Sequence, residues 1–555
     1  MSTCPTSCGR SSRTCCAAKH KEKEKESCPF SGSSFFVCRN LSKEVCAIQN
    51  KRVTALLRLT LVGGLLLLQI ALVVLASYLL RQRMFYAYAA LETLALICAL
   101  RIYNRPGGSS YKHGWILLVL ALPVVGLVLY YLWSGDRPNK RLELLPIAPP
   151  QEPEAARQYS RQRIAELGER NPAWSKLAAY LDRQGYLLWG DTQVTYFPSG
   201  EAYLEDMLQR LAQAERFIFL EYYIVAAGEI WDRLKTILLQ KAAQGVEIKL
   251  IFDDFGSMFR LPPEELEQLR QQGVGVTLFN PVHHYVNRAH FNYRDHRKIT
   301  CIDGNISYTG GVNLADEYAN RIVRFGHWKD CGVRLEGNGA WGLTREFLHM
   351  WRRLGGTLRD AEQQYRPQRG EGAGYCQTVA DGPDNNPQDT AEDVFLHLIA
   401  GARRWVYIAT PYLTIDDAML KALCIAADSG VDVRLLMPGV ADHKTAYWVG
   451  ESYFGELLRH GVKIYRYTPG LQHGKAVVAD GEAAFVGTVN MDYRSFRLHF
   501  ECGVVLYELP AIRQILQDME AVMGKSHRVL LPEWERRPWQ RRLLGWLLRP
   551  FASWM

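Results

Sequence analysis

Residues 217–223, Phe-Ile-Phe-Leu-Glu-Tyr-Tyr, form an apolar run typical of a buried strand and begin a unit that occurs twice in the chain. A helical stretch follows, and residues 246–252 then alternate like a second strand. In the second half, strand-like residues 405–411 and 431–437 flank another helical stretch. Strands that alternate with helices predict βαβ units around a mixed or parallel sheet. We therefore expect an α/β fold of two duplicated lobes packed with pseudo-twofold symmetry.

A short motif closes both units at the same place. In each copy a histidine is followed by lysine at position +2, aspartate at +7, glycine at +14 and asparagine at +17. The first copy consists of His296, Lys298, Asp303, Gly310 and Asn313, and the second of His473, Lys475, Asp480, Gly487 and Asn490. One copy would be weak support for function, whereas two copies at corresponding positions are strong support.

The spacing predicts a shared catalytic site. Residues at i and i+2 of a strand point to the same face, so His296 projects with Lys298, and His473 with Lys475. Pseudo-twofold packing of the lobes would bring both pairs into one cleft. The lysines and the two motif asparagines are donors suited to phosphate oxygens. One imidazole would attack phosphorus to give a phosphohistidine, and the other would protonate the leaving oxygen and then activate an incoming hydroxyl.

Four carboxylates are expected to support this chemistry. Asp303 and Asp480 precede glycines in hairpin-like turns, so they are expected to brace the turns more than to react. We assign Asp330 to the histidine of the first half and Glu501 to that of the second, where each would fix the imidazole tautomer. A surface salt bridge is the alternative for Asp330. No acidic or His/Cys cluster has metal-site spacing, and the lysines supply positive charge, so we expect neither metal nor cofactor.

The doubled motif resembles the phospholipase D superfamily, and from about residue 55 the chain resembles its bacterial cardiolipin synthase family. The resemblance includes residues 221–224, 292–298, 309–313, 381–383 and 490–495, and also Trp115, Pro123, Gly126 and Tyr130. It implies a phosphatidyltransferase that makes cardiolipin and glycerol from two phosphatidylglycerol molecules. It also implies His296 as nucleophile and His473 as acid/base, an order that the repeat symmetry alone leaves open. The cysteine-rich tail before residue 50 is not explained by it.

The N-terminal region predicts attachment to a membrane. Residues 59–80 are uncharged and long enough to cross a bilayer core, and residues 114–134 form a similar run containing Pro123. Between them, the shorter apolar run 84–102 carries Glu92. These runs predict a multi-pass protein of the cell membrane with no cleaved signal peptide and with a cytoplasmic N-terminus. Three spans would place the large domain outside the cell, and two would leave it inside.

The boundaries of the domains and linkers are predicted from the composition of each segment. We expect a disordered Cys/Lys-rich tail at 1–54, a transmembrane region at 55–135, a linker at 136–175, phospholipase D-like lobes at 176–370 and 371–530, and a basic, tryptophan-rich segment at 531–555. Basic residues interleaved with tryptophan in the last segment favour a helix in the membrane interface, with packing on the domain as the alternative.

Several other functions remain open at this level. The chain has 555 residues and a net charge of +9, from 66 basic and 57 acidic side chains. This modest charge and the membrane segments argue against a nuclease, so we expect phosphatidylglycerol and membrane lipids, and no nucleic acid, as partners. A phospholipase D hydrolase has the same motif with water as acceptor. A non-catalytic membrane scaffold is disfavoured by intact motifs in both halves.

Overall fold

The computed structural model describes residues 71, 75, 84–105, 109–133, 144–147, 151–281, 293–368, 370, 372–384 and 389–554. The chain divides into two compact units, Met1–Arg81 and Gln82–Met555, and the description below concerns the second. The predicted tail at 1–54 lies outside the described residues, as does the predicted span 59–80 apart from two positions.

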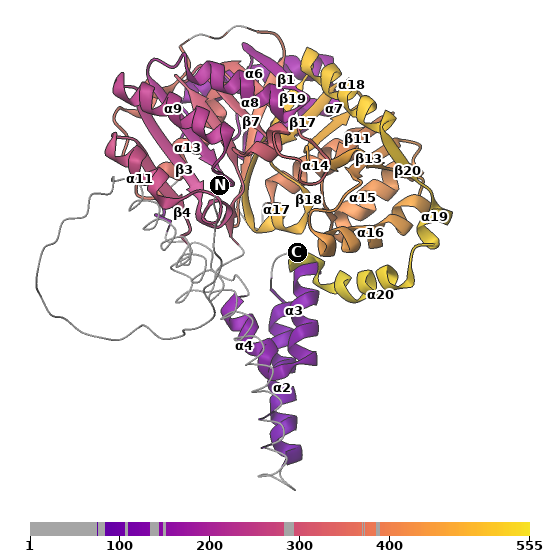
Figure 1. Ribbon diagram of the computed structural model, residues 1–555. Coiled ribbons are helices and arrows are strands. Elements are labelled where there is room, and N and C mark those ends of the chain that lie inside the picture. The colour runs from indigo at the N-terminus through magenta and orange to yellow at the C-terminus, as the bar shows by residue number, and fades with distance from the viewer. Residues whose placement is uncertain are drawn as a thin grey trace, which may run out of the picture. The chain divides into compact units, whose positions relative to one another are not determined.

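Two β-sheets with the same strand order form the centre of the two lobes (Figure 1). The first sheet has the order β1 (Thr192–Phe197), β9 (Gly332–Gly337), β7 (Ile306–Gly310), β6 (Lys298–Ile302), β2 (Phe217–Tyr222), β3 (Glu247–Asp253) and β4 (Gly275–Phe279). The second has the order β10 (Tyr375–Asp381), β19 (His499–Tyr507), β17 (Ala483–Gly487), β16 (Ala476–Ala479), β11 (Trp405–Ala409), β13 (Asp432–Pro438), β14 (Lys463–Tyr467) and β20 (Ser526–Val529). Apart from β20, the orders correspond strand for strand, so the predicted duplication is confirmed.

The pairing directions also agree between the lobes. The neighbours β2, β3 and β4 are parallel, as are β11, β13 and β14. The strands that directly follow the motif histidines, β6 and β16, run antiparallel to β2 and β11. Both sheets are therefore mixed, which is one of the two arrangements that the sequence predicts.

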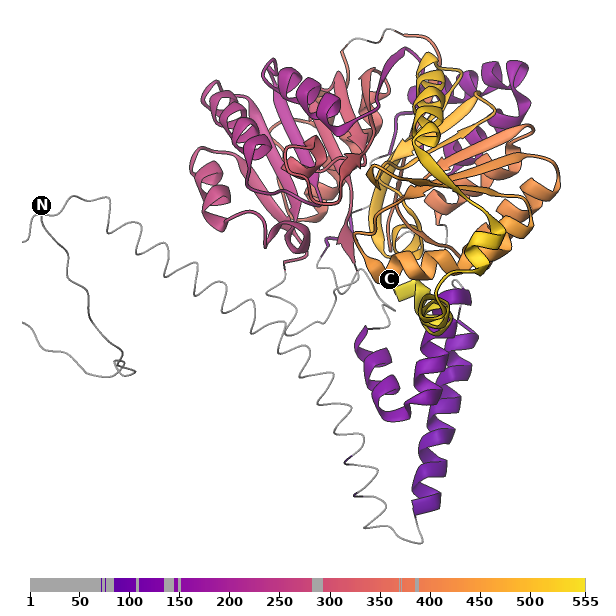
Figure 2. The same ribbon diagram turned by 45° about the vertical axis from the view of Figure 1, so that its right-hand side comes forward.

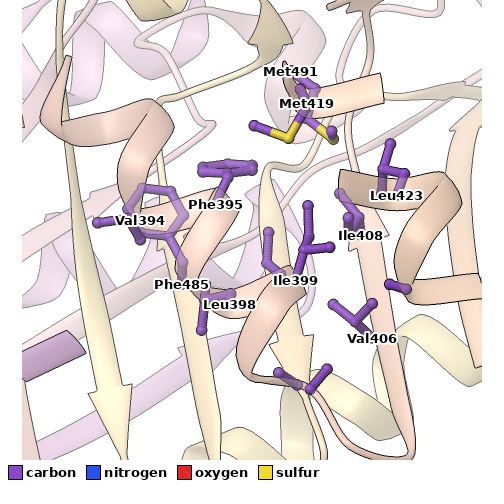
Figure 3. Packing of buried hydrophobic residues seen from close by; sticks show 14 of the residues in the cluster. Val394, Phe395, Leu398, Ile399, Val406, Ile408, Met419, Leu423, Phe485 and Met491 are labelled. Atoms are coloured by element: carbon purple, nitrogen blue, oxygen red, sulfur yellow. The ribbon is translucent and has the colours of Figure 1, made fainter. Parts of the chain in front are cut away.

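Helices cover the sheets because their apolar side chains recur at helical spacing. In the first lobe they are α8 (Gly200–Leu211), α9 (Glu229–Ala243), α10 (Asp254–Ser257), α11 (Pro263–Gln271), η3 (Asp316–Ala319), α13 (Ala340–Arg353) and η4 (Glu362–Tyr365). In the second they are α14 (Thr390–Gly401), α15 (Asp417–Asp428), α16 (Lys444–Arg459), α17 (Tyr493–Arg497) and α18 (Pro510–Gly524). Figure 3 shows part of the second lobe's core, where Val394, Phe395, Leu398 and Ile399 of α14 gather with Val406 and Ile408 of β11.

The two lobes lie side by side (Figure 2) and share a buried apolar cluster. Phe219 of β2 and Phe347 of α13 belong to the first half, and Ile512 and Ile515 of α18 to the second, yet all lie in one buried apolar cluster. The benzene rings of Phe219 and Phe347 are stacked with centroids 4.8 Å apart. Burial of this shared surface stabilises the lobes as a pair, at about 25 cal/mol for each Å² of apolar surface removed from water.

The predicted linker at 136–175 is wrong in its C-terminal part, and one helix crosses the predicted lobe boundary. Helix α6 (Glu154–Arg170) begins directly after Pro153, and α7 (Pro172–Arg183) follows it. Trp174 and Leu177 of α7 are buried in the core of the second lobe, although α7 precedes the first lobe in sequence. The prolines before residue 154 dominate the composition of this segment, so composition alone did not indicate the apolar face of α7 that follows.

The N-terminal apolar runs of the second unit are helical, with one interruption. The predicted span 84–102 corresponds to α2 (Met84–Tyr103). In place of one continuous span at 114–134 there are two helices, α3 (Ser109–Ala121) and α4 (Pro123–Trp133). The break falls at Leu122, directly before Pro123, which cannot donate a backbone hydrogen bond and therefore begins a new helix. Among the described residues, no helix combines the length and the apolar character that a membrane crossing requires.

Candidate active site

Each motif histidine contacts a carboxylate from the opposite half of the chain. Nδ1 of His296 lies 2.9 Å from Oε1 of Glu501, and Nδ1 of His473 lies 2.7 Å from Oδ2 of Asp330. The predicted pairing within each half is therefore wrong, because the partners are exchanged. Both carboxylates do take the orienting position that the sequence assigned to them.

Two short parallel bridges between the lobes cause this exchange. The strand β5 (Arg294–Asp295) pairs with the start of β19, and the backbone N–H of His296 donates to the carbonyl of Phe500, 2.9 Å away. Phe500 immediately precedes Glu501 in the chain, so the bridge places His296 beside that carboxylate.

The second bridge repeats this geometry with the lobes interchanged. The strand β15 (Gly470–Gln472) pairs with β8 (His327–Lys329), and the N–H of His473 donates to the carbonyl of Lys329, 2.7 Å away. Lys329 immediately precedes Asp330. No long-range signal in the sequence marks these bridges, which comprise two or three residues on each strand.

The two carboxylates are themselves held differently. The hydroxyl of Thr488 donates to Oε2 of Glu501. The corresponding residue in the first half is Gly311, where a Cβ atom would overlap with the Asp330 carboxylate. Asp330 instead accepts the backbone N–H of Cys331 at 2.9 Å. The glycine therefore leaves space for the shorter aspartate side chain to reach His473.

Both motif lysines are fully buried beside the histidines. Nζ of Lys298 donates to the carbonyl of His296 at 2.6 Å, and Nζ of Lys475 lies 2.8 and 3.0 Å from the two ring nitrogens of His473. Burial, together with the charge of Lys475, lowers the pKa of Lys298 to about 7, although Glu501 opposes the shift. Burial also lowers the pKa of Lys475. An anionic group in the site would favour the charged form of both.

The charges around the histidines indicate a single site. Burial holds the pKa of His296 well below its usual value, and the charges of Lys298, Lys475 and His473 lower it further. Burial and Lys475 lower the pKa of His473 as well, while Asp330 opposes this shift. The two His–Lys pairs are therefore close enough for the charges of one to affect the other.

The motif asparagines differ in their contacts. Oδ1 of Asn313 accepts the N–H of Ile224 at 3.0 Å, and its Nδ2 donates to the hydroxyl of Tyr318 at 2.7 Å. Oδ1 of Asn490 is buried and has no hydrogen-bond partner among the described residues. Asn313 thus connects the motif to its own lobe, and contact of either amide with phosphate remains a prediction.

Asp303 and Asp480 lie at the ends of β6 and β16 that are remote from the histidines. Each adopts a left-handed backbone conformation, with φ of 53° and 54°. Each carboxylate accepts three consecutive backbone N–H groups at 2.7–3.0 Å, those of residues 215–217 for Asp303 and 403–405 for Asp480. These hydrogen bonds hold the turns that follow β6 and β16, as expected for residues that brace the hairpins.

Sequence reasoning missed the rings that pack against the histidines. The imidazole of His499 lies 5.5 Å from that of His296, and the indole of Trp328 lies 5.2 Å from His473, measured between ring centroids. His499 lies two residues before Glu501, and Trp328 lies two residues before Asp330, so the two rings occupy corresponding places in the two halves. That spacing is the only signal in the sequence, and it is recognisable only after the exchanged pairing is known.

His499 makes the surroundings of His296 polar. Its Nε2 accepts from Nε of Arg494 at 3.3 Å, and its Nδ1 lies 3.7 Å from Oε1 of Glu501. Burial lowers the pKa of His499 to about 3, so the ring is neutral near pH 7. The corresponding Trp328 offers His473 an apolar face.

His296, His499 and Glu501 are the described residues whose ligand-type atoms gather closely enough for a metal ion, within 4.8 Å of one another. Lys298, Lys475 and Arg494 all contribute positive charge at His296. A cation would be repelled there, whereas a phosphodiester would be attracted. The residues therefore fit an anionic substrate better than a metal ion.

Two His–Lys pairs from duplicated lobes, each oriented by a carboxylate of the other lobe, define a phosphodiester-processing site of the phospholipase D type. The family described as "Cardiolipin synthase, PLD-like domain" matches residues 207–323 and 395–523, and that described as "Phospholipase_D-nuclease N-terminal" matches residues 93–135. The chain belongs to the cardiolipin synthase family.

Similar proteins occur in several bacteria. Cardiolipin synthase 2 of Bacillus anthracis is 35% identical over 459 residues, which cover 80% of this chain and 87% of the relative. Cardiolipin synthase of Alkalihalophilus pseudofirmus is 34% identical, with 78% and 86% covered, and an uncharacterized protein of Streptococcus mutans is 36% identical, with 79% and 95% covered. The phosphatidylserine synthase structure of Haemophilus influenzae is similar in fold, with a TM-score of 0.51, 13% identity and coverage of 65% of this chain and 93% of that one.

Proposed function

We propose that the protein is a cardiolipin synthase, which transfers the phosphatidyl group of one phosphatidylglycerol to the terminal hydroxyl of another and releases glycerol. The observation that carries the proposal is the exchanged pairing of His296 with Glu501 and His473 with Asp330. Relatives from Bacillus and Alkalihalophilus that carry this name, similar over about four fifths of the chain, support the lipid substrate.

The first half-reaction begins at His296. Glu501 accepts a hydrogen bond from Nδ1–H of His296, which keeps the proton on Nδ1 and leaves the lone pair of Nε2 free to attack phosphorus. As the N–P bond forms, the bond between phosphorus and the oxygen of the headgroup glycerol breaks. The departing oxygen takes a proton from Nε2 of His473, and glycerol leaves.

The second half-reaction reverses these roles. Neutral His473 removes the proton from the terminal hydroxyl of a second phosphatidylglycerol, and that oxygen attacks the phosphorus held on His296. The N–P bond breaks and cardiolipin is released. His473 regains the proton that it gave up in the first step, so the cycle is balanced.

The surroundings of the two histidines support this assignment of roles. A nucleophile must be neutral, and burial with the nearby positive charges holds the pKa of His296 well below its usual value. Burial and Lys475 also lower the pKa of His473, but the Asp330 carboxylate opposes this shift, so His473 holds a proton more readily than His296 does, as the general acid of the pair must. Two environments that separate the titrations of paired groups are typical of acid–base partners.

The lysines would stabilise the charge that develops on the phosphoryl oxygens. Nζ of Lys475 already touches His473, and Lys298 and Lys475 both lie close enough to affect the pKa of His296. Both ammonium groups are buried, so their attraction for an anion is little weakened by water. Nδ2 of Asn490 is a further donor proposed to face the phosphate, and the Oδ1 of the same amide has no hydrogen-bond partner among the described residues.

We also propose that the N-terminal segments hold the catalytic lobes at the cell membrane. The spans at 59–80, 84–102 and 114–134 would make the protein multi-pass, although the third corresponds to the separate helices α3 and α4. Accessibility of cysteines introduced after residue 135, probed in intact cells, would determine the side on which the lobes lie. A lipid substrate and membrane attachment are consistent with each other.

Product analysis tests the proposed reaction. The purified full chain is incubated with phosphatidylglycerol in mixed micelles, with His296→Ala and His473→Ala as controls. Cardiolipin and glycerol in equal amounts are expected from the natural chain, and neither from the two variants. Phosphatidic acid with glycerol would instead establish a phospholipase D hydrolase, and no lipid conversion would indicate a scaffold.

A further inference from the structure

The end of the chain forms a helix that is docked on the second lobe by one face only. After α19 (Leu531–Glu535), helix α20 (Trp539–Leu548) lies against α16, and η5 (Arg549–Trp554) follows. Gly545 is buried at this contact, where a Cβ atom would lie 3.3 Å from the carbonyl of Trp448. The inner face of α20 therefore packs on the domain, which was the alternative expected for the C-terminal segment.

The outer face of α20 is apolar and uncovered. Its exposed side chains are Trp539 at 66%, Leu543 at 44%, Trp546 at 72% and Leu547 at 48%. The spacing of i, i+4, i+7 and i+8 places them on one side of the helix. Indole side chains are among the largest apolar groups, and a stripe of this kind is typical of a surface that meets a membrane or a partner.

Basic side chains line one edge of this stripe. Arg536 and Arg542 are exposed, and a hollow of about 590 Å³ beside the stripe is lined by Arg459, Trp534, Glu535, Arg537, Arg542, Leu543 and Trp546. Three of these seven residues are arginines and one is acidic. Guanidinium groups pair with phosphate in a bidentate manner, so the edge suits anionic lipid headgroups.

The surface is joined to both the N-terminal helices and the catalytic site. The indoles of Trp554 and Trp115 of α3 have centroids 4.5 Å apart, and a Cβ atom at Gly114 would lie 3.0 Å from the carbonyl of Pro550. The carbonyl of Trp554 accepts from Arg494 at 3.3 Å, and Arg494 also donates to His499 beside His296. A membrane contact at α20 would thus hold the catalytic site at a fixed distance from the membrane surface.

We infer that the outer face of α20 is a binding site for the surface of an anionic bilayer. Trp539, Leu543, Trp546 and Leu547 enter the boundary between headgroups and acyl chains, while Arg536 and Arg542 bind lipid phosphates. This inference goes beyond the proposed reaction, because it concerns how the lobes contact the bilayer that contains the substrate.

Fluorescence of the reconstituted full chain tests the contact directly. The protein is placed in phosphatidylcholine bilayers with or without phosphatidylglycerol, in which part of the lipid carries brominated acyl chains that quench indole fluorescence. Quenching is expected to be stronger with phosphatidylglycerol and to decrease in Trp539→Phe/Trp546→Phe. Equal quenching of the natural chain and this double variant would overturn the inference.

Activity provides a second measurement that is independent of any single tryptophan. Leu543→Glu is compared with Ile425→Glu, an equally acidic change at a side chain of α15 that is 52% exposed. We expect Leu543→Glu to lower turnover at least tenfold in phosphatidylglycerol bilayers while leaving turnover in mixed micelles unchanged, and Ile425→Glu to change neither. Natural turnover of Leu543→Glu in bilayers would overturn the inference.

Other outcomes remain informative. A change in the oligomeric mass of Leu543→Glu in detergent would show that a second copy covers the stripe, which also overturns the inference. If Leu543→Glu loses turnover in micelles as well, the folding of the variant is impaired, and the quenching result decides. If the natural chain makes no cardiolipin at all, the proposed reaction fails while quenching still tests the bilayer contact.

Discussion

His296 and Glu501 belong to different halves of the chain, yet Nδ1 of the imidazole lies 2.9 Å from Oε1 of the carboxylate. The same exchange joins His473 to Asp330. Each half therefore supplies a histidine and lysine to one side of the site and a carboxylate to the other. Neither motif histidine therefore has its carboxylate partner in its own lobe, and we expect catalysis to depend on the bridges β5–β19 and β15–β8.

Removing the negative charge of one carboxylate should affect the histidine of the other half. We expect Glu501→Gln and Asp330→Asn each to lower kcat by about 10⁴-fold, the effect of the equivalent change in a hydrolase triad. The loss arises because the imidazole is no longer held in the tautomer that leaves Nε2 reactive. Steady-state turnover in mixed micelles measures it.

Titration of the imidazoles by NMR separates the two pairings. Glu501→Gln should change the chemical shifts and titration of His296 much more than those of His473, and Asp330→Asn should do the reverse. The opposite pattern would instead support the pairing that the sequence predicted, in which each histidine contacts the carboxylate of its own half.

Loss of either lysine should remove charge stabilisation from the transition state. Lys298→Ala and Lys475→Ala are each expected to lower kcat by about 10²–10³-fold, or about 3–4 kcal/mol, the effect of deleting one strong oxyanion donor. Both lysines are buried, so a neighbouring side chain cannot easily replace them. Turnover of a variant within threefold of the natural chain would exclude its lysine from the phosphate site.

The fold was largely predictable from the sequence, since its decisive signals are local. Apolar strand runs such as residues 217–223 and the doubled motif predicted two similar lobes, and the equal strand orders confirm them. The position of α7 was not predictable, because its packing on the second lobe joins residues about 200 positions apart, such as Trp174 and Phe395. The period of the helix indicates which face is buried, and only the tertiary structure shows what buries it.

The motif histidines and lysines of the candidate site, which lie just before or at the start of β6 and β16, were predictable, and their partners were not. The i, i+2 spacing of a strand places His296 with Lys298 whichever way the lobes pack. The choice between Asp330 and Glu501 as partner depends on the bridges between the lobes, and sequence distance favoured the wrong one. His499 and Trp328 were missed for the same reason, since each contacts the histidine of the other half.

Anion binding should weaken as pH rises through about 7. Burial lowers the pKa of Lys298 from 10.5 to about 7, so its positive charge is present below that pH and lost above it. We expect the inhibition constant of sulfate, whose own charge is constant between about pH 6 and 9, to rise over this range. In Lys298→Arg the rise should be smaller, because arginine stays charged while Lys475, whose pKa is also lowered, can still lose its proton.

The same pKa shift has a defined effect on stability. Between about pH 7 and 10.5 the unfolded chain binds a proton at Lys298 that the folded chain lacks. This group alone therefore makes the free energy of unfolding rise with pH across that window. A sulfate inhibition constant that stays level from pH 6 to 9 in the natural chain would contradict the lowered pKa.

Asp303 should matter for stability more than for chemistry. Its carboxylate accepts the N–H groups of residues 215–217, and Asp303→Ala would leave these donors without partners at a cost of about 1–3 kcal/mol. Asp303→Asn should cost less, because asparagine keeps an acceptor and tolerates the left-handed conformation. Thermal unfolding should show Tm falling in the order natural chain, Asn, Ala, with kcat per folded molecule unchanged. A large loss of kcat at an unaltered Tm would instead assign the carboxylate to the reaction.

His499 should act as a positioning residue for the pair of His296 and Glu501. Because Nε2 accepts from Arg494, the proton of the neutral ring is on Nδ1, 3.7 Å from Oε1 of Glu501. His499→Phe keeps a ring against His296 but removes this N–H. We expect kcat to fall roughly tenfold to a hundredfold, the range found for outer partners of catalytic groups, with KM for phosphatidylglycerol unchanged.

The matched variants separate positioning from packing. His499→Gln retains an N–H donor and should recover most of the lost kcat, whereas a role limited to packing would leave Gln at least as impaired as Phe. Trp328→Phe, at the corresponding place beside His473, removes no group that contacts a carboxylate and should change kcat much less. If His499→Phe and Trp328→Phe lower kcat equally, the difference between the two halves has no part in catalysis, and His499 serves His296 only as a packed ring.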